Sequence, residues 1–332
     1  MKVLHIIGNG LDISLGMETQ YKAFLQNYYL TKDNPKETIL KLKKNINQDL
    51  DNWSDAELEF GNYAKYCDSA IEYIECINDF KSNLREYISS QYQSVFSEQT
   101  SYCFSDFLTD LKYPEKRLAP KVLQKFSSFY NPLAKITKEV SVNVLTFNYT
   151  NTFEQILQEF GKTHEAYFKI VNSIKVYHLH GTLNNQMTFG VNDPSQIISE
   201  KNIMDESNFF EIVKPLFNDA CLNTNNSDCE NQINQANIIS IYGASIGATD
   251  QKWWDYIGNQ MQERSNLSII YFPFDNKKDP LITPQYLSKW CTDYQHFLIE
   301  RLNLPKNDDK ISDRIFVNVN VPLFEVTQST IY

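Results

Sequence analysis

The chain has 332 residues, of which 42% are hydrophobic and 14% aromatic. This composition supports one large α/β domain or two smaller ones and argues against intrinsic disorder. A formal net charge of −10 disfavours nucleic acid as a partner, because sequence-independent binding to nucleic acid relies on clustered Lys and Arg.

The chain also lacks the marks of a membrane or secreted protein. No stretch approaches about 18 consecutive apolar residues, and the first residues lack the charged-then-apolar layout of a secretion signal. The cysteines are scattered without a C-x-x-C pair, which favours reduced thiols in a cytoplasmic protein over a zinc site or a disulfide framework. They are Cys67, Cys76, Cys103, Cys221, Cys229 and Cys291.

The first predicted strand, residues 3–7, is an apolar run followed by Gly8, Asn9 and Gly10. Two glycines directly after a strand are typical of a turn that binds a nucleotide, because they let the backbone approach a phosphate. The alternative interpretation is a tight turn in which Asp12 caps the next helix.

A helical region follows the first turn. Residues 19–30 have helical spacing of their apolar side chains. A dehydrogenase-type fold would instead place a second strand and an acidic residue about 20 positions on, and neither is found. Residues 50–140 continue the helical pattern. We therefore expect a single α/β domain over residues 1–332 with a helical insertion, residues 50–140, covering one side of a sheet.

Strand-like runs return in the second half of the chain and alternate with helical segments. They span residues 142–149, 174–181, 187–191, 237–245, 266–274 and 314–321. This alternation predicts a Rossmann-like, doubly wound parallel sheet to which both ends of the sequence contribute. The Asn- and Ser-rich residues 223–237 are predicted to form a surface loop.

Ligands of such sheets gather at the carboxyl ends of the strands, where this sequence places polar residues. Thr146, Asn148 and Tyr149 end the strand at 142–149. The amide of Asn148 both donates and accepts hydrogen bonds, which suits ribose hydroxyls or a water molecule. The alternative is that Asn148 caps the following helix.

Two of the five histidines lie on one strand. His178 and His180 share a face because side chains alternate along a strand. Histidine titrates near neutral pH, so His180, next to Gly181, is a candidate general base. We expect His178, and His5 within the first strand, to be buried structural residues. No third His or Cys stands at a spacing that suggests a metal site.

A second glycine-containing turn, "YGASIGATD", follows "NIIS" at the end of the predicted strand and includes Gly243, Ser245 and Asp250. It offers another surface for a nucleotide, although Asp250 also suits a helix cap. Neither a G-x-S-x-G elbow nor a Walker P-loop is present, so a serine nucleophile lacks a motif.

Taken together, the motifs resemble those of the AbiH family of bacterial phage-defence (abortive infection) proteins. They are "IIGNGLDISLGMETQYKAF", "WSDAELEFG", "LTFNYTNTFE", "HLHG", "FGVND" and "IYGASIGATD". They occur in the family's order and extend to about Ile257. The resemblance implies an anti-phage function.

Part of the set also resembles the wider sirtuin-like group, whose nucleotide-binding turn does not need a third glycine. This resemblance implies that Gly8 and Gly10 lie at the NAD phosphates, that Asn148 holds the ribose and the attacking water, and that His180 is the base. It places Gly243 and Ser245 on the adenosine side. The expected cofactor-binding residues are completed by Asn9, Asp12, Thr146, Tyr149 and Asp250.

Two departures from the sirtuin-like pattern bear on the reaction. Asp12 stands where that turn tends to have a small hydroxyl residue, and a carboxylate near a pyrophosphate is unfavourable unless it caps a helix or binds a cation. The four-cysteine zinc module of deacylating sirtuins is absent. We therefore expect hydrolysis of NAD rather than protein deacylation.

The first functional hypothesis is an NAD glycohydrolase that uses NAD as its substrate and needs no metal. Such an enzyme must be kept inactive, so we expect regulation by homo-oligomerisation or by a phage-derived trigger. The second hypothesis is a metal-dependent nuclease or nucleotide phosphohydrolase in which Asp12, Glu57, Asp193 and Asp250 hold Mg²⁺. The third is a sensor that binds a nucleotide without turning it over.

Overall fold

The computed structural model describes residues 1–30, 36–96, 100–134, 139–199, 206–220, 225–275 and 284–330. Its strands are β1 (Lys2–Ile7), β2 (Thr100–Phe104), β3 (Ser141–Thr146), β4 (Val176–His178), β5 (Ile238–Tyr242), β6 (Ser268–Phe272), β7 (Ile315–Val317) and β8 (Val326–Thr330).

The helices up to the end of β4 are α1 (Gly10–Ser14), α2 (Tyr21–Leu30), α3 (Glu37–Gln48), α4 (Ala56–Tyr63), α5 (Ala70–Val95), α6 (Phe107–Lys112), α7 (Pro120–Ala134), α8 (Thr152–Thr163) and α9 (Phe168–Val171). The later helices are α10 (Glu206–Phe209), α11 (Lys214–Ala220), α12 (Asn225–Gln235), α13 (Gln251–Glu263), α14 (Pro284–Arg301) and α15 (Asp309–Ser312). Short 3₁₀ turns include η5 (Pro194–Gln196) and η6 (Ala248–Asp250).

The main sheet has six strands in the order β4-β3-β1-β5-β6-β7, and every neighbouring pair is parallel. β1 lies in the middle, with Val3 opposite Val142 of β3 and opposite Ile238 of β5. The prediction of a Rossmann-like, doubly wound parallel sheet built from both ends of the sequence is confirmed.

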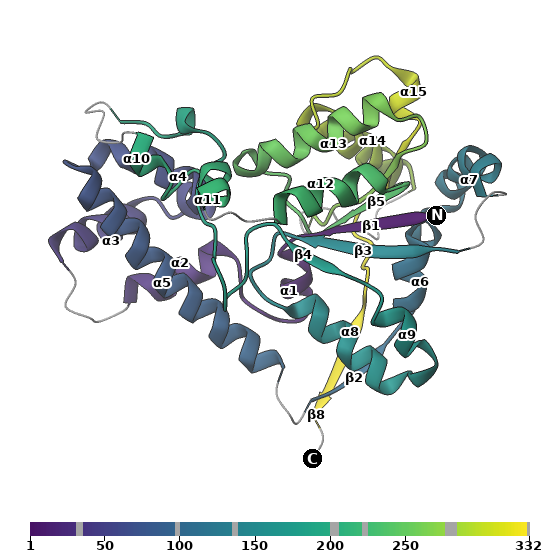
Figure 1. Cartoon of the computed structure of the whole chain (residues 1–332), viewed down its shortest axis with the longest axis horizontal. Coiled ribbons are helices and arrows are strands. Elements are labelled where there is room, and N and C mark those ends of the chain that lie inside the picture. Colours follow the sequence, from purple (N-terminus) through teal and green to yellow (C-terminus); the bar gives the residue numbers. More distant parts are fainter. Residues whose placement is uncertain are drawn as a thin grey trace.

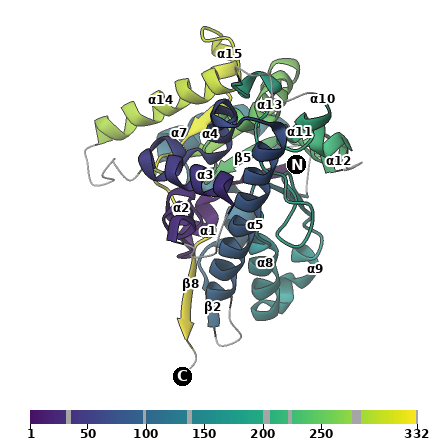
Figure 2. The same cartoon turned by 90° about the vertical axis from the view of Figure 1, so that its left-hand side faces the viewer.

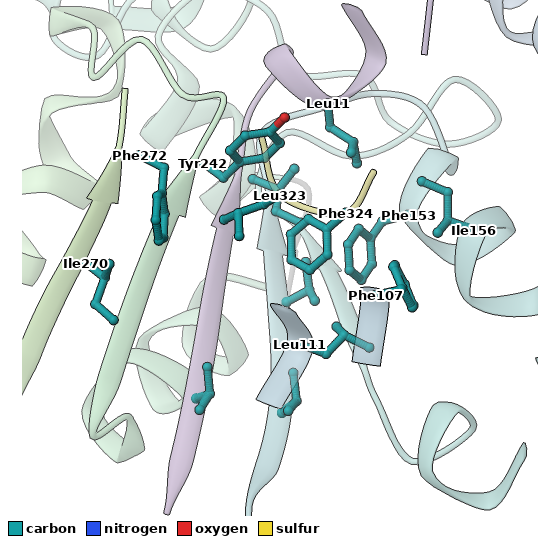
Figure 3. Close-up of a cluster of buried hydrophobic side chains, with 14 of the residues drawn as sticks. Leu11, Phe107, Leu111, Phe153, Ile156, Tyr242, Ile270, Phe272, Leu323 and Phe324 are labelled. Atoms are coloured by element: carbon teal, nitrogen blue, oxygen red, sulfur yellow. The ribbon is translucent and has the colours of Figure 1, made fainter. Parts of the chain in front are cut away.

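Helices cover both faces of this sheet, so its strands are apolar on both sides. In Figure 1, α12, α13 and α14 lie above the sheet, and α1, α6 and α8 lie below it. Val3 and Ile7 of β1 pack into the lower core, whereas Leu4 and Ile6 pack into the upper one. Figure 3 shows part of the lower core, where aromatic side chains such as Phe107 and Phe324 meet the strands.

A third apolar core lies among α2, α3, α4 and α5. These helices lie to the left of the sheet in Figure 1 and face the viewer in Figure 2. The centre of this core is a group of aromatic rings in which Phe80 contacts Phe24, Phe60 and Phe189 with ring centroids 4.7–5.3 Å apart. Phe189 belongs to the segment that follows β4. This packing therefore fixes α4 against the carboxyl edge of the sheet.

The structure corrects two predicted elements. Residues 225–235, expected to be part of a surface loop, form α12, in which Cys229 and Ile233 are buried against the sheet. The Asn-rich composition hid this helix because its few apolar residues lie on one face. Residues 187–191, expected to be a strand, make only an isolated bridge between Val191 and Val213.

The segment between residues 50 and 140 is not wholly helical. It contains β2, which pairs with β8 near the end of the chain in a two-stranded antiparallel sheet. Cys221 and residues 223–224 of the expected loop lie outside the described residues, and none of the other five cysteines is in a disulfide bond within the described part of the chain. Among the described residues, no helix is long and apolar enough to cross a membrane.

Candidate functional site

The carboxyl ends of four parallel strands carry the residues expected to act on a nucleotide. Gly8 follows β1, Asn148 follows β3, His180 follows β4 and Gly243 follows β5. The strand order places β4, β3, β1 and β5 side by side, so all four residues lie along one edge of the sheet.

His180 is held by a carboxylate. Its Nε2 lies 2.8 Å from Oδ1 of Asp250, the residue that precedes α13. The imidazole is buried, and its Nδ1 has no hydrogen-bond partner among the described residues. With Nε2 protonated toward Asp250, Nδ1 carries the lone pair. This pairing orients the ring and leaves one nitrogen to accept a proton.

Two further charged side chains complete a buried network around Asp250. Nζ of Lys214 donates to Oδ1 of Asp250 at 2.7 Å and to Oε2 of Glu57 at 2.8 Å. The side chain of Lys214 is only 4% exposed, so its charge is neutralised by these two carboxylates rather than by water. Because Glu57 lies on α4, the network joins the helical region to the sheet edge.

The pKa shifts in this network follow from burial and from the neighbouring charges. Burial tends to raise the pKa of Asp250, but the charges of Lys214 and His180 outweigh it and the net shift is downward. Burial raises the pKa of Glu57 more than Lys214 lowers it. Burial tends to lower the pKa of Lys214, but Asp250 and Glu57 raise it above its usual value. Asp250 is therefore the firmly ionised carboxylate of the pair.

A second polar cluster surrounds Asp12. Its Oδ2 accepts a hydrogen bond of 2.7 Å from Oγ1 of Thr150, which in turn accepts one from Thr152. Oδ1 of Asp12 and Oδ1 of Asn148 are buried and have no hydrogen-bond partner within the described residues. Two open acceptors near the ends of β1 and β3 suit a ligand that donates from hydroxyl groups.

Asp12 does not cap a helix. It lies in the first turn of α1, and Asn9 is the residue before that helix. Burial raises the pKa of Asp12 to about 6, against smaller opposing effects of its polar neighbours Thr152, Thr150 and Asn148.

We expect a measurable pH effect from Asp12. An acid whose pKa is raised on folding loses stability as pH rises from 3.8 toward about 6. The shift corresponds to about 3 kcal/mol. Asp12→Asn cannot ionise, so its stability relative to the unmutated protein should improve by up to that amount between pH 4 and pH 7. Urea unfolding at both pH values measures the difference, with exposed Asp309→Asn as the control. A relative stability that does not change with pH would contradict the assigned shift.

The glycine turns are packed against each other. The N–H of Gly8 donates to the carbonyl of Tyr242 at 3.0 Å, and that of Gly10 donates to the carbonyl of Gly243 at 2.9 Å. A Cβ atom at Gly8 would lie 2.6 Å from Cα of Ala244, and one at Gly10 would lie 2.5 Å from Cα of Gly243. The glycines are therefore required by a close backbone contact between two turns.

The remaining expected residues of these turns have structural contacts. The side chain of Asn9 bonds to Thr19, and Oγ1 of Thr146 donates to the carbonyl of Ile7 at 3.1 Å. The hydroxyl of Tyr149 donates to the carbonyl of Thr188 at 2.8 Å, and its ring lies 6.5 Å from that of His180. Ser245 is exposed.

The two other histidines of the strands are buried and bonded. His178 contacts the carbonyl of Asn148 through Nδ1 at 2.9 Å and Oε1 of Glu154 through Nε2 at 2.7 Å. Nε2 of His5 lies 2.9 Å from the carbonyl of Leu111, and burial lowers its pKa to about 4. Both contacts agree with structural rather than catalytic residues.

His178→Ala should therefore destabilise the fold. Burial tends to lower the pKa of His178, but Glu154 outweighs it and the net shift is upward. The loss should be about 1–3 kcal/mol below pH 6.5 and should shrink as pH rises through the raised pKa, because the neutral ring binds Glu154 less strongly. Thermal unfolding of both proteins at pH 6 and pH 8 measures it. An unchanged melting temperature at pH 6 would contradict the structural assignment.

The space beside His180 is small. A cavity of about 10 Å³ is lined by His180, Lys214, Asn218, Thr249, Asp250 and Trp253, among others. This volume holds about one water molecule. Gly8, Asn148 and Gly243 do not line this cavity, although they lie along the same sheet edge.

Comparison with known protein families decides the family. The model of the family described as bacteriophage abortive infection AbiH matches residues 4–271. The chain belongs to the AbiH family. No curated protein matches it. The AbiH match confirms the predicted family and a function in abortive infection, and it includes every residue of the His180 network.

Sequence reasoning missed part of this candidate site. Glu57 was considered only as a metal ligand, and Lys214 was not considered, although it is a lone cation in the largely apolar run at residues 209–217. The four carboxylates of the metal hypothesis do not meet in the structure. Lys214 lies between Glu57 and Asp250, Asp12 bonds Thr150, and Asp193 caps η5 through the N–H of Ser195.

Proposed function

We propose that this AbiH-family protein is an NAD glycohydrolase that cleaves the bond between nicotinamide and ribose. The observation that carries the proposal is the pair of buried His180 and partly buried Asp250 at the carboxyl edge of the sheet, with Nδ1 of His180 left without a partner among the described residues. An oriented imidazole with one open nitrogen is suited to accept a proton from water.

The reaction needs few groups. The bond between the ribose carbon and the nicotinamide nitrogen breaks through an oxocarbenium-like state, and the electron pair leaves with nicotinamide, which becomes neutral. A water oxygen bonds to the same carbon, and His180 accepts the proton that this water loses.

The small cavity beside His180 adds a requirement. It accommodates a water molecule but not a ribose, so the segments around it must separate before NAD reaches His180. An enzyme that depletes NAD harms its own cell unless it is held inactive. A closed site that opens through homo-oligomerisation or a phage-derived trigger fits this need.

The deciding experiment measures the products formed from NAD. Purified protein is incubated with NAD, alone and with extract of phage-infected cells, and free nicotinamide and ADP-ribose are quantified with and without EDTA. We expect equal amounts of both products and no effect of EDTA. Loss of turnover with EDTA would favour the metal-dependent hydrolase. Binding of NAD without any product in either condition would favour the sensor, and both results would reject the proposal.

A further inference from the structure

A larger groove opens beside the His180 cavity. Its volume is about 450 Å³, within the range of about 300–1,000 Å³ that is usual for small-molecule sites. Val213, Pro215 and Leu216 line it near the start of α11, and Lys252, Asp255 and Tyr256 line it from α13. The groove is therefore bounded by the helix starts that also supply Lys214 and Asp250 to the buried network.

The groove and the cavity are adjacent and share three lining residues. Both are lined by Asn192, Pro215 and Lys252. The side chain of Asn192 is fixed there, because its Oδ1 accepts the N–H of Lys252 at 3.0 Å. A ligand lying in the groove thus has its inner end at Lys252, next to the cavity that His180 lines.

The chemistry of the lining changes along the groove. Lys252 supplies a cation at the inner end, whereas Asp193 and Asp255 line only the groove. Among the described residues, Gln251 and Asn303 donate to Asp255, both to Oδ1, and this leaves Oδ2 for a ligand donor. The walls between these charges are formed by Pro, Val and Leu side chains and the ring of Tyr256.

This arrangement matches a nucleotide in one orientation. Apolar walls suit the faces of a base, carboxylates suit ribose hydroxyls, and an ammonium group suits a phosphate. We propose that the groove binds the adenosine diphosphate half of NAD, with the diphosphate at Lys252 and the adenosine toward Asp255. The proposal rests on the proposed function and directs the nicotinamide ribose toward His180.

The proposed position of the diphosphate, at Lys252, differs from the position that the sirtuin-like resemblance implies, at Gly8 and Gly10. Those glycines are packed against the backbone of Gly243 and Ala244. Lys252, by contrast, is partly exposed at the junction of the groove and the cavity.

The test is calorimetric titration of the full chain with ADP-ribose and, separately, with inorganic diphosphate. Lys252→Ala removes the cation, and Leu216→Trp fills the groove without changing charge. Lys169→Ala, an exposed lysine on α9, is the matched control. We expect Lys252→Ala to weaken ADP-ribose binding about ten- to hundredfold, as loss of a charge-assisted hydrogen bond does. Leu216→Trp should abolish ADP-ribose binding and keep diphosphate binding, with its folding checked by melting temperature.

Equal ADP-ribose affinities for Lys252→Ala and Lys169→Ala would reject the proposal that the groove binds the adenosine diphosphate half of NAD. Equal affinities of the unmutated protein for ADP-ribose and diphosphate would also reject it. Nicotinamide release, measured on the same samples, separates the two proposals. If the unmutated protein releases no nicotinamide but Lys252→Ala and Leu216→Trp lose ADP-ribose binding, the result supports ligand binding in the groove and rejects the proposed function. If Lys252→Ala and Leu216→Trp cleave NAD with an unchanged KM, the proposed function stands and the proposal that NAD binds in the groove is rejected.

Discussion

His180→Ala is expected to lower the rate of nicotinamide release by about 10²–10⁴, the usual cost of losing a general base. The imidazole is the group that the structure leaves with an open, buried nitrogen beside Asp250. The main-chain contacts of the β4 end do not depend on this ring, so the variant should remain folded. The measurement is initial rate at saturating NAD, under conditions in which the unmutated protein is active.

Two comparisons make the His180 result specific. His296→Ala removes an exposed histidine on α14 and should keep full activity. Melting temperatures of both variants show whether a lower rate reflects chemistry or unfolding. Full turnover by His180→Ala would mean that the base is elsewhere and that the sirtuin-like interpretation of this site is wrong.

Lys214→Met is expected to give the largest loss of stability, about 3–5 kcal/mol near pH 7, because it leaves the buried Glu57 and the partly buried Asp250 without their shared cation. Glu57 already has a raised pKa, and removing Lys214 raises it further. Since Glu57 then gains a proton at a higher pH, part of the loss should be recovered at pH 5. Urea unfolding of the variant and of the unmutated protein at both pH values tests this.

The matched variants are Lys169→Met, at an exposed lysine, and the double change Lys214→Met with Glu57→Gln. The exposed substitution should change stability by less than about 0.5 kcal/mol. The double variant should be more stable than Lys214→Met alone, because only one carboxylate, Asp250, then lacks its ammonium partner. The assigned ion-pair network would be contradicted if Lys214→Met lost the same stability at pH 5 and pH 7 and the double variant recovered none of it.

In the proposed enzyme, the buried network would connect the helical region to His180. Glu57 is carried by α4, Lys214 begins α11, and Asp250 precedes α13. A movement of the helical region that withdraws Glu57 would leave Lys214 paired with Asp250 alone, beside His180 and the mouth of the groove. A trigger acting on the helices could therefore open the cavity and alter the electrostatics of His180 in one step.

The sequence by itself determined the sheet. Residues 3–7 and 238–242 are apolar at nearly every position. A strand covered by helices on both faces buries every side chain, so consecutive residues must be apolar and the pattern can be read directly from the sequence. It also placed Asn148 and His180 at strand ends, because that position depends only on where an apolar run stops. The order of the motifs led to the AbiH family, which the family match confirms.

Only the tertiary structure decided which of these residues act together. Asp250 meets His180 and Lys214 through contacts between single side chains, and such contacts leave no periodic pattern in the sequence. The helix α12 was hidden for a related reason, since packing against the sheet selects it from a polar segment with few apolar residues. Likewise, the contact between the turns at Gly8 and Gly243 depends on β1 and β5 being neighbours, which strand order in the folded sheet alone establishes.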